Sequence, residues 1–328
     1  MCTCTSSDDH IVTSDVTDAE LIRIFEKVKN WGRWGKDDQK GTLNLITPEK
    51  RKQAAALVRA GESYSITRPL LKGPGVGNHP RVDHHMLYFP GAPGTYDYIG
   101  IASHGYYLTH IDALAHGIWE GKTWNGFPLK VGAIGPDEQF GASQAPGGIS
   151  HDGCYVCGLE TYKEGVFTRG VFLDLAAAKG VDYLDNTYGI TAKDLDFAEE
   201  YSGIRVEPGD ALFLRMGLRK HAEALGHDVD FAKRGGLVAS AYEWIGDRDV
   251  ALFGGDCIEK FPYSTPRFAT PFHQIALVSM GLCLLDWPEV ERLSEACRLH
   301  KRNEFLLTVA PLPVDGGTGC AVNPIVTF

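Results

Sequence analysis

The stretch "SHGYYLTHIDALAH", residues 103–116, contains four side chains that can bind metal ions or transfer protons: His104, His110, Asp112 and His116. His110 and Asp112 are two residues apart, which places both on one face of an extended strand. Asp112 and His116 are four apart, which aligns them along one side of a helical turn. A strand that ends near Asp112 and turns into a helix would direct these three side chains into one pocket. Imidazole and carboxylate together suit a borderline divalent ion such as Zn²⁺ or Mn²⁺. The alternative interpretation is that the histidines are ordinary core or surface residues and that Asp112 caps a helix.

A metal site needs further ligands, and the segment "RFATPFHQIALVSMGLCLLD" (267–286) offers two. Thr270 can cap a helix that starts with Pro271, which leaves His273 in the first turn. The positive end of the helix dipole there disfavours protonation and keeps the imidazole available as a ligand. Asp286 ends an apolar segment, where a buried carboxylate needs a partner. The alternative for His273 is an exposed histidine of a first helical turn.

Two further segments carry side chains that could hold a substrate. In "NWGRWGKDDQKG", Trp31 and Trp34 offer aromatic faces for a flat ring, although ordinary core packing would also explain them. In "RVDHHMLYFPG", His84 and His85 are adjacent and cannot face the same way on a strand. They are interpreted as pocket lining or as part of a surface loop.

The helices and strands that must position these residues are predicted from the periodicity of apolar residues and from the residues that start and end helices. An amphipathic helix is predicted over 17–31, with Thr17 and Glu20 in a capping-box pattern, and a second helix from Thr47 to near Gly61. Residues 31–46 and 310–324 are predicted to be loops. Further elements are strands at 96–103, 170–176 and 209–217, and helices at 191–203, 237–248 and 287–302.

Strands and helices alternate irregularly, without repeats or low-complexity linkers, which indicates one mixed α/β domain with flanking helices over 17–328. Residues 1–16 are expected to form a flexible N-terminus.

The composition excludes several classes of partner. The 328 residues carry 42 acidic and 32 basic side chains, for a net charge of −10, and no Lys/Arg cluster that would bind nucleic acid or anionic lipid. The longest strongly apolar run, 275–285, is far shorter than the roughly 20 residues that span a bilayer. No signal peptide is recognised, so a cytoplasmic location is expected. The pairs Cys2/Cys4 and Cys154/Cys157 are interpreted as free thiols rather than a zinc or redox site.

"THIDALAHGIWEGKTWNG" (109–126) resembles the metal-dependent cyclase family, which includes bacterial kynurenine formamidase, isatin hydrolase and trans-dienelactone hydrolase. The resemblance extends to "WGKDDQKGTLNLITPEKRKQAA", "RGVFLDLA", "VEPGDALFLRMG" and "FLLTVAPLPVDGGTGCAVNP", and so covers nearly the whole chain, as in the longer members. It implies the family's mixed-sheet fold, of the swivelling β/β/α type.

The family's short signature is His-x-Gly-Thr-His-x-Asp-x-Pro-x-His. Carried over, it implies that His110 and Asp112 bind a metal and that His116 transfers protons. The family also has a downstream His and a downstream Glu. His273 matches this His and is assigned with His116 to catalysis. Asp286 stands in the place of the Glu and is assigned to the metal.

The chain departs from this signature at three positions. Tyr106 occupies the first ligand histidine, Leu108 the glycine and Leu114 the proline. His104 is therefore the candidate substitute ligand, and Tyr106 is assigned with Trp31, Trp34 and His85 to substrate binding. The missing first histidine ligand, and an aspartate where the family has the longer glutamate, favour one metal ion per chain over two. The same two departures argue against the two-metal mechanism of kynurenine formamidase and against its substrate.

The resemblance implies a metal-dependent hydrolase that opens a small cyclic ester or amide, with an ion that activates water and His116 as the base. Two alternatives stay open. One is a metal-dependent cyclase, dehydratase or isomerase, and the other is a non-catalytic protein that binds a small molecule. The implied cofactor is one Zn or Mn ion per chain, and the implied assembly is a homo-oligomer.

Overall fold

The strands predicted near 170–176 and 209–217 lie side by side in the middle of a nine-stranded sheet. The structure is a computed structural model that describes residues 16–70, 82–105, 107–128, 153–262 and 265–328. The strand order is β1-β13-β11-β5-β7-β9-β10-β4-β12. Strands β5, β7, β9 and β10 run parallel to their neighbours in that series, and the outer strands pair antiparallel.

The strands of this sheet are β1 (Ser63–Ser65), β4 (His110–Asp112), β5 (Val166–Asp174), β7 (Ala211–Arg215), β9 (Leu252–Gly255), β10 (Cys283–Asp286), β11 (Glu304–Val309), β12 (Gly319–Ala321) and β13 (Ile325–Thr327). Two small sheets pair β2 (Asp83–Leu87) with β3 (Tyr96–Gly100), and β6 (Gly189–Ile190) with β8 (Gly236–Leu237). The helices are α1 (Asp18–Lys27), α2 (Pro48–Ala55), α3 (Leu175–Ala178), α4 (Ala192–Ser202), α5 (Leu218–Leu225), α6 (Ala239–Asp247), α7 (Pro271–His273) and α8 (Val290–His300).

The central strands are buried on both faces, which explains their nearly continuous apolar sequences. All five residues of β7 and all four of β9 are buried, and α2, α4 and α8 contact β5. Helices also connect successive parallel strands, as α3 and α4 do between β5 and β7. The predicted mixed α/β fold class is confirmed.

Three local predictions are wrong. The second helix ends at Ala55 rather than near Gly61, because the chain then turns into β1, which pairs with β13. The segment 310–324, predicted as loop, contains β12, which pairs with β4. The histidines at 84 and 85 lie on a strand, β2, rather than on a surface loop. The predicted flexible N-terminus, apart from its last residue, lies outside the described residues.

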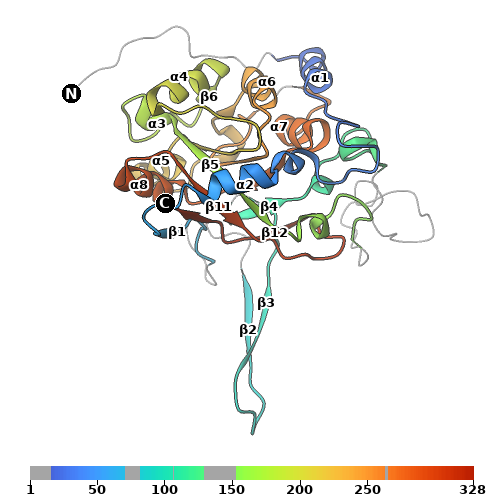
Figure 1. The fold of residues 1–328 in the computed structure, drawn as a ribbon, viewed down its shortest axis with the longest axis vertical. Coiled ribbons are helices and arrows are strands. Elements are labelled where there is room, and N and C mark those ends of the chain that lie inside the picture. Colours follow the sequence, from blue (N-terminus) through green and yellow to red (C-terminus); the bar gives the residue numbers. More distant parts are fainter. Residues whose placement is uncertain (1–15, 71–81, 106, 129–152, 263–264) are drawn as a thin grey trace.

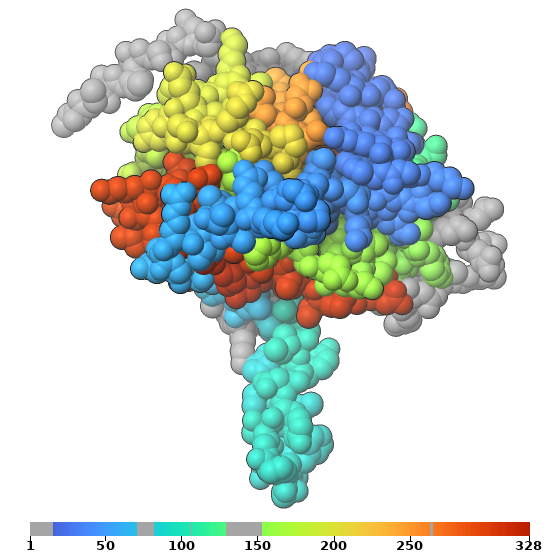
Figure 2. Space-filling view, viewed as in Figure 1, coloured from blue at the N-terminus to red at the C-terminus, as the bar shows by residue number. Residues whose placement is uncertain are grey.

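The hairpin formed by β2 and β3 projects from the body of the molecule (Figure 1), and the space-filling view shows it as a narrow extension (Figure 2). In the described part of the chain no helix is long and apolar enough to cross a bilayer.

A buried ion cluster joins α2, β5 and β7. Asp210, which directly precedes β7, accepts hydrogen bonds from Nε and Nη2 of Arg169 at 3.0 and 2.7 Å. Its Oδ1 also lies 2.5 Å from Nζ of Lys50 on α2. All three side chains are buried, so removal of the shared carboxylate would leave two cations in the interior without their main partner.

We therefore predict that Asp210→Asn lowers the free energy of unfolding by about 3–5 kcal/mol, the range for a broken buried pair. Glu207 contacts the same two cations at 3.6 and 3.4 Å, but its side chain is half exposed. Glu207→Gln should therefore cost less than about 1 kcal/mol. Urea unfolding of both variants measures the difference, and equal losses would contradict this account of the cluster.

Candidate metal and catalytic site

Strand β4 carries His110 and Asp112 at its two ends, and a 3-10 turn over Leu114–His116 follows. The predicted strand that turns at Asp112 is thus confirmed. In the sheet, β4 lies between β10 and β12, and His110 is paired directly with Asp286 of β10. Side chains of directly paired residues lie on the same face of a sheet, and so do residues two apart on one strand. This register brings His110, Asp112 and Asp286 onto one face.

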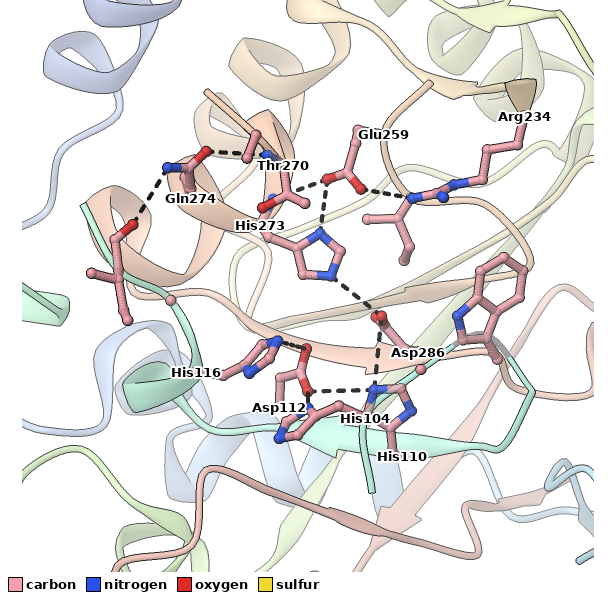
Figure 3. Close-up of a pocket in the computed structure, with 16 residues that line it drawn as sticks. His104, His110, Asp112, His116, Arg234, Glu259, Thr270, His273, Gln274 and Asp286 are labelled. Atoms are coloured by element: carbon pink, nitrogen blue, oxygen red, sulfur yellow. Dashed lines mark hydrogen bonds and ion pairs between the residues drawn. The ribbon is translucent and has the colours of Figure 1, made fainter. Parts of the chain in front are cut away.

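That face forms the floor of a cavity of about 350 Å³. The polar residues that line it are His104, His110, Asp112, His116, Arg234, Glu259, Thr270, His273, Gln274 and Asp286. Figure 3 shows the imidazoles of His104, His110, His116 and His273 around the carboxylates of Asp112 and Asp286. The structure therefore brings together every residue predicted as a metal ligand or catalytic group, while their individual roles stay predictions.

The ligand-type atoms form two groups that share Asp112. One group is His104, His110 and Asp112, and the other is Asp112, His273 and Asp286. Within each group the nitrogen and oxygen atoms lie within 4.8 Å of one another. Oδ1 of Asp112 lies 2.9 Å from Nδ1 of His104 and 3.5 Å from Nε2 of His110. Oδ2 of Asp286 lies 3.4 Å from Nε2 of His273.

Several of these buried atoms have no hydrogen-bond partner among the described residues. They are both carboxylate oxygens of Asp112, Oδ1 of Asp286 and Nδ1 of His104. Nδ1 of His104 and Oδ1 of Asp112 do lie 2.9 Å apart, close enough to form an ion pair. Buried polar atoms normally find partners, because an unsatisfied one costs about 1–3 kcal/mol. All four atoms belong to residues of the two ligand groups that line the cavity, where a cation would satisfy them.

His104 is held in place from two sides. Its ring stacks on that of His116, with centroids 3.9 Å apart, and its Nε2 lies 3.1 Å from the hydroxyl of Thr318. Gly319 of β12 makes this position available, because a Cβ there would lie 2.5 Å from Cε1 of His104. His110 is fixed by Nδ1, which donates to the carbonyl of Leu108 at 3.0 Å and leaves Nε2 directed at Asp112.

The charges around Asp112 set the protonation of its neighbours. Burial alone would raise the pKa of Asp112, but the imidazoles of His116 and His110 outweigh it and hold the pKa below its usual value. Burial, together with the nearby imidazoles of His104 and His273, lowers the pKa of His116 to about 4 despite the attraction of Asp112. His116 is therefore neutral near pH 7. One third of its side chain is exposed, at the cavity.

His273 lies between two carboxylates. Its Nδ1 is 2.8 Å from Oε2 of Glu259, and its Nε2 faces Asp286. Glu259 in turn accepts a hydrogen bond from Nη2 of Arg234 at 2.9 Å. Burial alone lowers the pKa of His273, but Glu259 and Asp286 raise it well above its usual value. The helix terminus is expected to disfavour protonation of His273, whereas the two carboxylates beside the ring favour its protonated form.

The helix that carries His273 also differs from the expectation. After one turn of α7 the chain continues as a π-helix over Gln274–Met280, a form common at functional sites. Thr270 precedes it without a side-chain cap, although its backbone N–H donates to the side chain of Gln274.

The residues predicted to bind substrate lie elsewhere or are not described. The indole of Trp31 donates to the carbonyl of Val278 at 2.6 Å, and Trp34 packs near Trp124 with ring centroids 6.1 Å apart. Neither tryptophan is among the residues that line the cavity. His85 is exposed on the β2–β3 hairpin, and Tyr106 lies outside the described residues. Their roles in substrate binding stay predictions.

Sequence reasoning missed Glu259 and Arg234, although both line the cavity and complete the chain of contacts behind His273. One signal was present: "GGDCIEK" places acidic residues just after β9, and polar residues beyond the carboxyl ends of parallel strands commonly form sites.

Comparisons with known proteins agree with this fold. The sequence profile of the family described as "Putative cyclase" matches residues 45–259. A crystal structure described as a novel cyclase is 28% identical, with a TM-score of 0.76 over 92% of this chain and 99% of that one. Isatin hydrolase A from Labrenzia aggregata is 17% identical, with a TM-score of 0.54 over 83% of this chain and 94% of that one.

The isatin hydrolase A from Ralstonia solanacearum is also 17% identical, with a TM-score of 0.53 over 84% and 93% of the two chains. No curated protein sequence matches significantly. At this low identity the two isatin hydrolases show a shared fold, whereas the family profile covers well over half of the chain. The chain therefore belongs to the cyclase family.

Proposed function

We propose that this protein is a metal-dependent hydrolase that opens a small cyclic ester or amide. The observation that carries the proposal is the pair of ligand groups sharing Asp112, with buried oxygen and nitrogen atoms that lack partners among the described residues. The fold is also that of two isatin hydrolases, each 17% identical to this chain.

The donor set fits a divalent cation such as Zn²⁺ or Mn²⁺, because it combines imidazole with carboxylate. His104, His110, Asp112 and Asp286 would hold the ion, and His273 would join them if it released its proton. A bound ion of this kind supplies Lewis acidity and a water of lowered pKa.

In this proposal His116 is the group that moves protons. Its ring is neutral near pH 7 and reaches the cavity, so it can accept a proton from a water molecule there. Its Nε2 lies 3.9 Å from Oδ2 of Asp112, which favours the imidazolium once the proton has arrived. The same proton can then pass to the leaving oxygen or nitrogen of the opened ring.

Glu259 positions His273. Its carboxylate accepts hydrogen bonds from both the backbone N–H and Nδ1 of His273, at 3.2 and 2.8 Å, and Arg234 anchors the carboxylate from behind. Nε2 of His273 is thereby kept towards Asp286 and Asp112. Histidines that bind a metal ion or transfer a proton are commonly oriented by a carboxylate in this way.

The size of the cavity restricts the substrate to small molecules, since about 350 Å³ is near the lower end of ligand pockets. Its polar lining favours a substrate that bears a carbonyl group. The alternative of a cyclase or isomerase would use the same groups, so an isotope experiment is needed to separate the two.

Metal binding is the first test. Asp112→Asn removes the charged residue that both groups share, and we expect the affinity for Mn²⁺ or Zn²⁺ to fall by more than about 100-fold, beyond the loss typical of an outer-shell change. Calorimetric titration of chelator-treated protein measures it. The exposed Asp182 offers a matched control, and Asp182→Asn should bind like the wild type. Equal affinity in Asp112→Asn and wild type, or no binding by either, would refute the metal site.

The reaction type is tested with lactones and cyclic amides in ¹⁸O-labelled water. A hydrolase places one labelled oxygen in the carboxylate product, while a cyclase or isomerase gives a product of unchanged mass. His116→Gln should lower kcat by about 100-fold or more, because it removes the proton acceptor while leaving the metal content unchanged. An unlabelled product would favour the isomerase alternative, and full activity of His116→Gln would remove that residue from the mechanism.

The role of Glu259 can be read from the titration of His273. Glu259→Gln removes the carboxylate that most raises the pKa of His273, so the pKa of His273 in metal-free protein should fall. Histidine ring signals in NMR spectra recorded across a pH series measure this, with Asp182→Asn as the control. An unchanged His273 titration would show that Glu259 does not set its charge.

A further inference from the structure

A second cavity, of about 390 Å³, lies beside the metal and catalytic cavity. Its walls come mainly from residues 68–69, 218–231 and 287–289. Trp287, which directly follows Asp286 in the sequence, lines both cavities, and no other described residue does so. The second cavity is therefore a separate space with its own set of side chains.

Arg68 brings a positive charge to this second cavity. Its side chain is partly buried, and its Nε is buried without a hydrogen-bond partner among the described residues. The guanidinium lies over the ring of Trp287, 5.3 Å from the ring centroid, and this contact holds it at the wall of the cavity. Burial lowers the pKa of Arg68 despite the attraction of Glu289 and Asp256. Arg68 is thus a desolvated cation with an unsatisfied donor, which an acceptor in the cavity would stabilise.

The other charged residues that line the second cavity have partners of their own. Arg219 contacts the carboxylate of Glu289, and its Nε donates to Oε1 of Glu223 at 3.3 Å. Asp228 also has interactions of its own, and it attracts Arg68 only from a distance. Among the described residues, no carboxylate forms an ion pair with Arg68. The guanidinium of Arg68 is therefore available to a ligand that carries a negative charge.

Aromatic rings form part of the wall beside Arg68. The rings of Phe231 and Trp287 meet edge to face, with centroids 5.4 Å apart and an angle of 89° between their planes. Tyr107 meets Phe231 in the same way, at 5.5 Å and 79°. All three residues line the second cavity. Aromatic ring faces and edges pack favourably on another aromatic ring, so the cavity offers a cation beside a surface suited to a planar ligand.

The backbone at Trp287 has an unusual conformation. Its φ is 55°, in the left-handed region that bulky residues rarely adopt. The hydroxyl of Thr109 donates to the carbonyl of Trp287 at 2.8 Å and stabilises this conformation. Strained residues persist only where the surrounding structure enforces them, and they cluster at ligand and catalytic sites. The indole that the two cavities share is therefore a fixed part of the wall.

We propose that the second cavity binds a small aromatic carboxylate. The carboxylate accepts hydrogen bonds from the guanidinium of Arg68, whose planar donors match its two oxygens, and the ring packs against Phe231 and Trp287. A cationic ligand is disfavoured because Arg68 already lies over Trp287. The volume of about 390 Å³ is that of the smaller ligand pockets. No metal ion takes part in this site, so the proposal does not depend on the proposed hydrolase activity.

Calorimetric titration of benzoate into the full chain tests the site, after chelator treatment so that no metal ion holds the carboxylate. We expect one saturable site per chain. Benzamide has a similar shape but no charge, so it should bind at least about tenfold more weakly than benzoate. Arg68→Gln should lower the affinity for benzoate by at least about tenfold, because it removes the charged donor. The control Arg292→Gln removes an exposed arginine of α8 outside the cavity and should bind like the wild type.

A second pair of variants tests the place of binding without removing a charge. Ala222 lies on α5 and lines the second cavity, so Ala222→Leu narrows the cavity while Arg68 stays in place. We expect this variant to bind benzoate at least about tenfold more weakly. Ala224 is exposed on the same helix and does not line the cavity, so Ala224→Leu should bind like the wild type. Circular dichroism establishes that each variant is folded.

Three results would overturn the proposal: no binding of benzoate by the wild type, equal affinity for benzoate and benzamide, or wild-type affinity in folded Arg68→Gln. Wild-type affinity in Ala222→Leu would also overturn it, because benzoate would then bind outside this cavity. Titration with Mn²⁺ is an independent measurement. A wild type that binds benzoate but neither Mn²⁺ nor Zn²⁺ would refute the proposed function and leave the carboxylate site in place.

Discussion

The burial of one carboxylate, that of Asp112, governs the organisation of this site. Asp112 is wholly inaccessible to solvent, at the end of a short strand that lies between two others. Burying a charge is costly unless partners compensate it, and the described residues provide no hydrogen bond to either of its oxygens. Instead, the rings of His104, His110 and His116 surround it at distances from 2.9 to 3.9 Å. The cavity is thus arranged around an unsatisfied negative charge.

The sheet topology supplies the other half of the site. Because β10 lies between β9 and β4, the carboxyl end of β10 brings Asp286 beside His110, and the segment after β9 brings Glu259 behind His273. Segments far apart in the sequence, 104–116 and 259–286, therefore meet at one cavity. Small residues make this close approach feasible: Gly319 leaves the space that the ring of His104 fills.

Local spacing was sufficient to predict the part of the site that lies on one strand and turn, since separations of two and four residues fix relative directions. The start of a predicted helix and the end of an apolar segment indicated His273 and Asp286, but not their environment. Spacing did not indicate Glu259, because the parallel pairing of β9 and β10 brings its segment to the cavity, or Arg234, which comes from a separate segment just before β8. Of the β2–β3 hairpin, β3 lies within the strand predicted at 96–103, whereas its partner β2 was not predicted as a strand.

The charge balance of the cavity bears on the number of metal ions. Asp112, Asp286 and Glu259 carry three negative charges, and Arg234 with protonated His273 carries two positive ones, which leaves one negative charge if the other imidazoles are neutral. Metal ligation requires a neutral imidazole, so binding would release the proton of His273. The two positive charges of one divalent ion, together with the charge of Arg234, would then balance the three carboxylates. The cavity would carry no net charge. A second ion would add two positive charges that no described carboxylate of the cavity could offset. On this count we propose that a single ion lies between the two ligand groups, with Asp112 as the residue that both share.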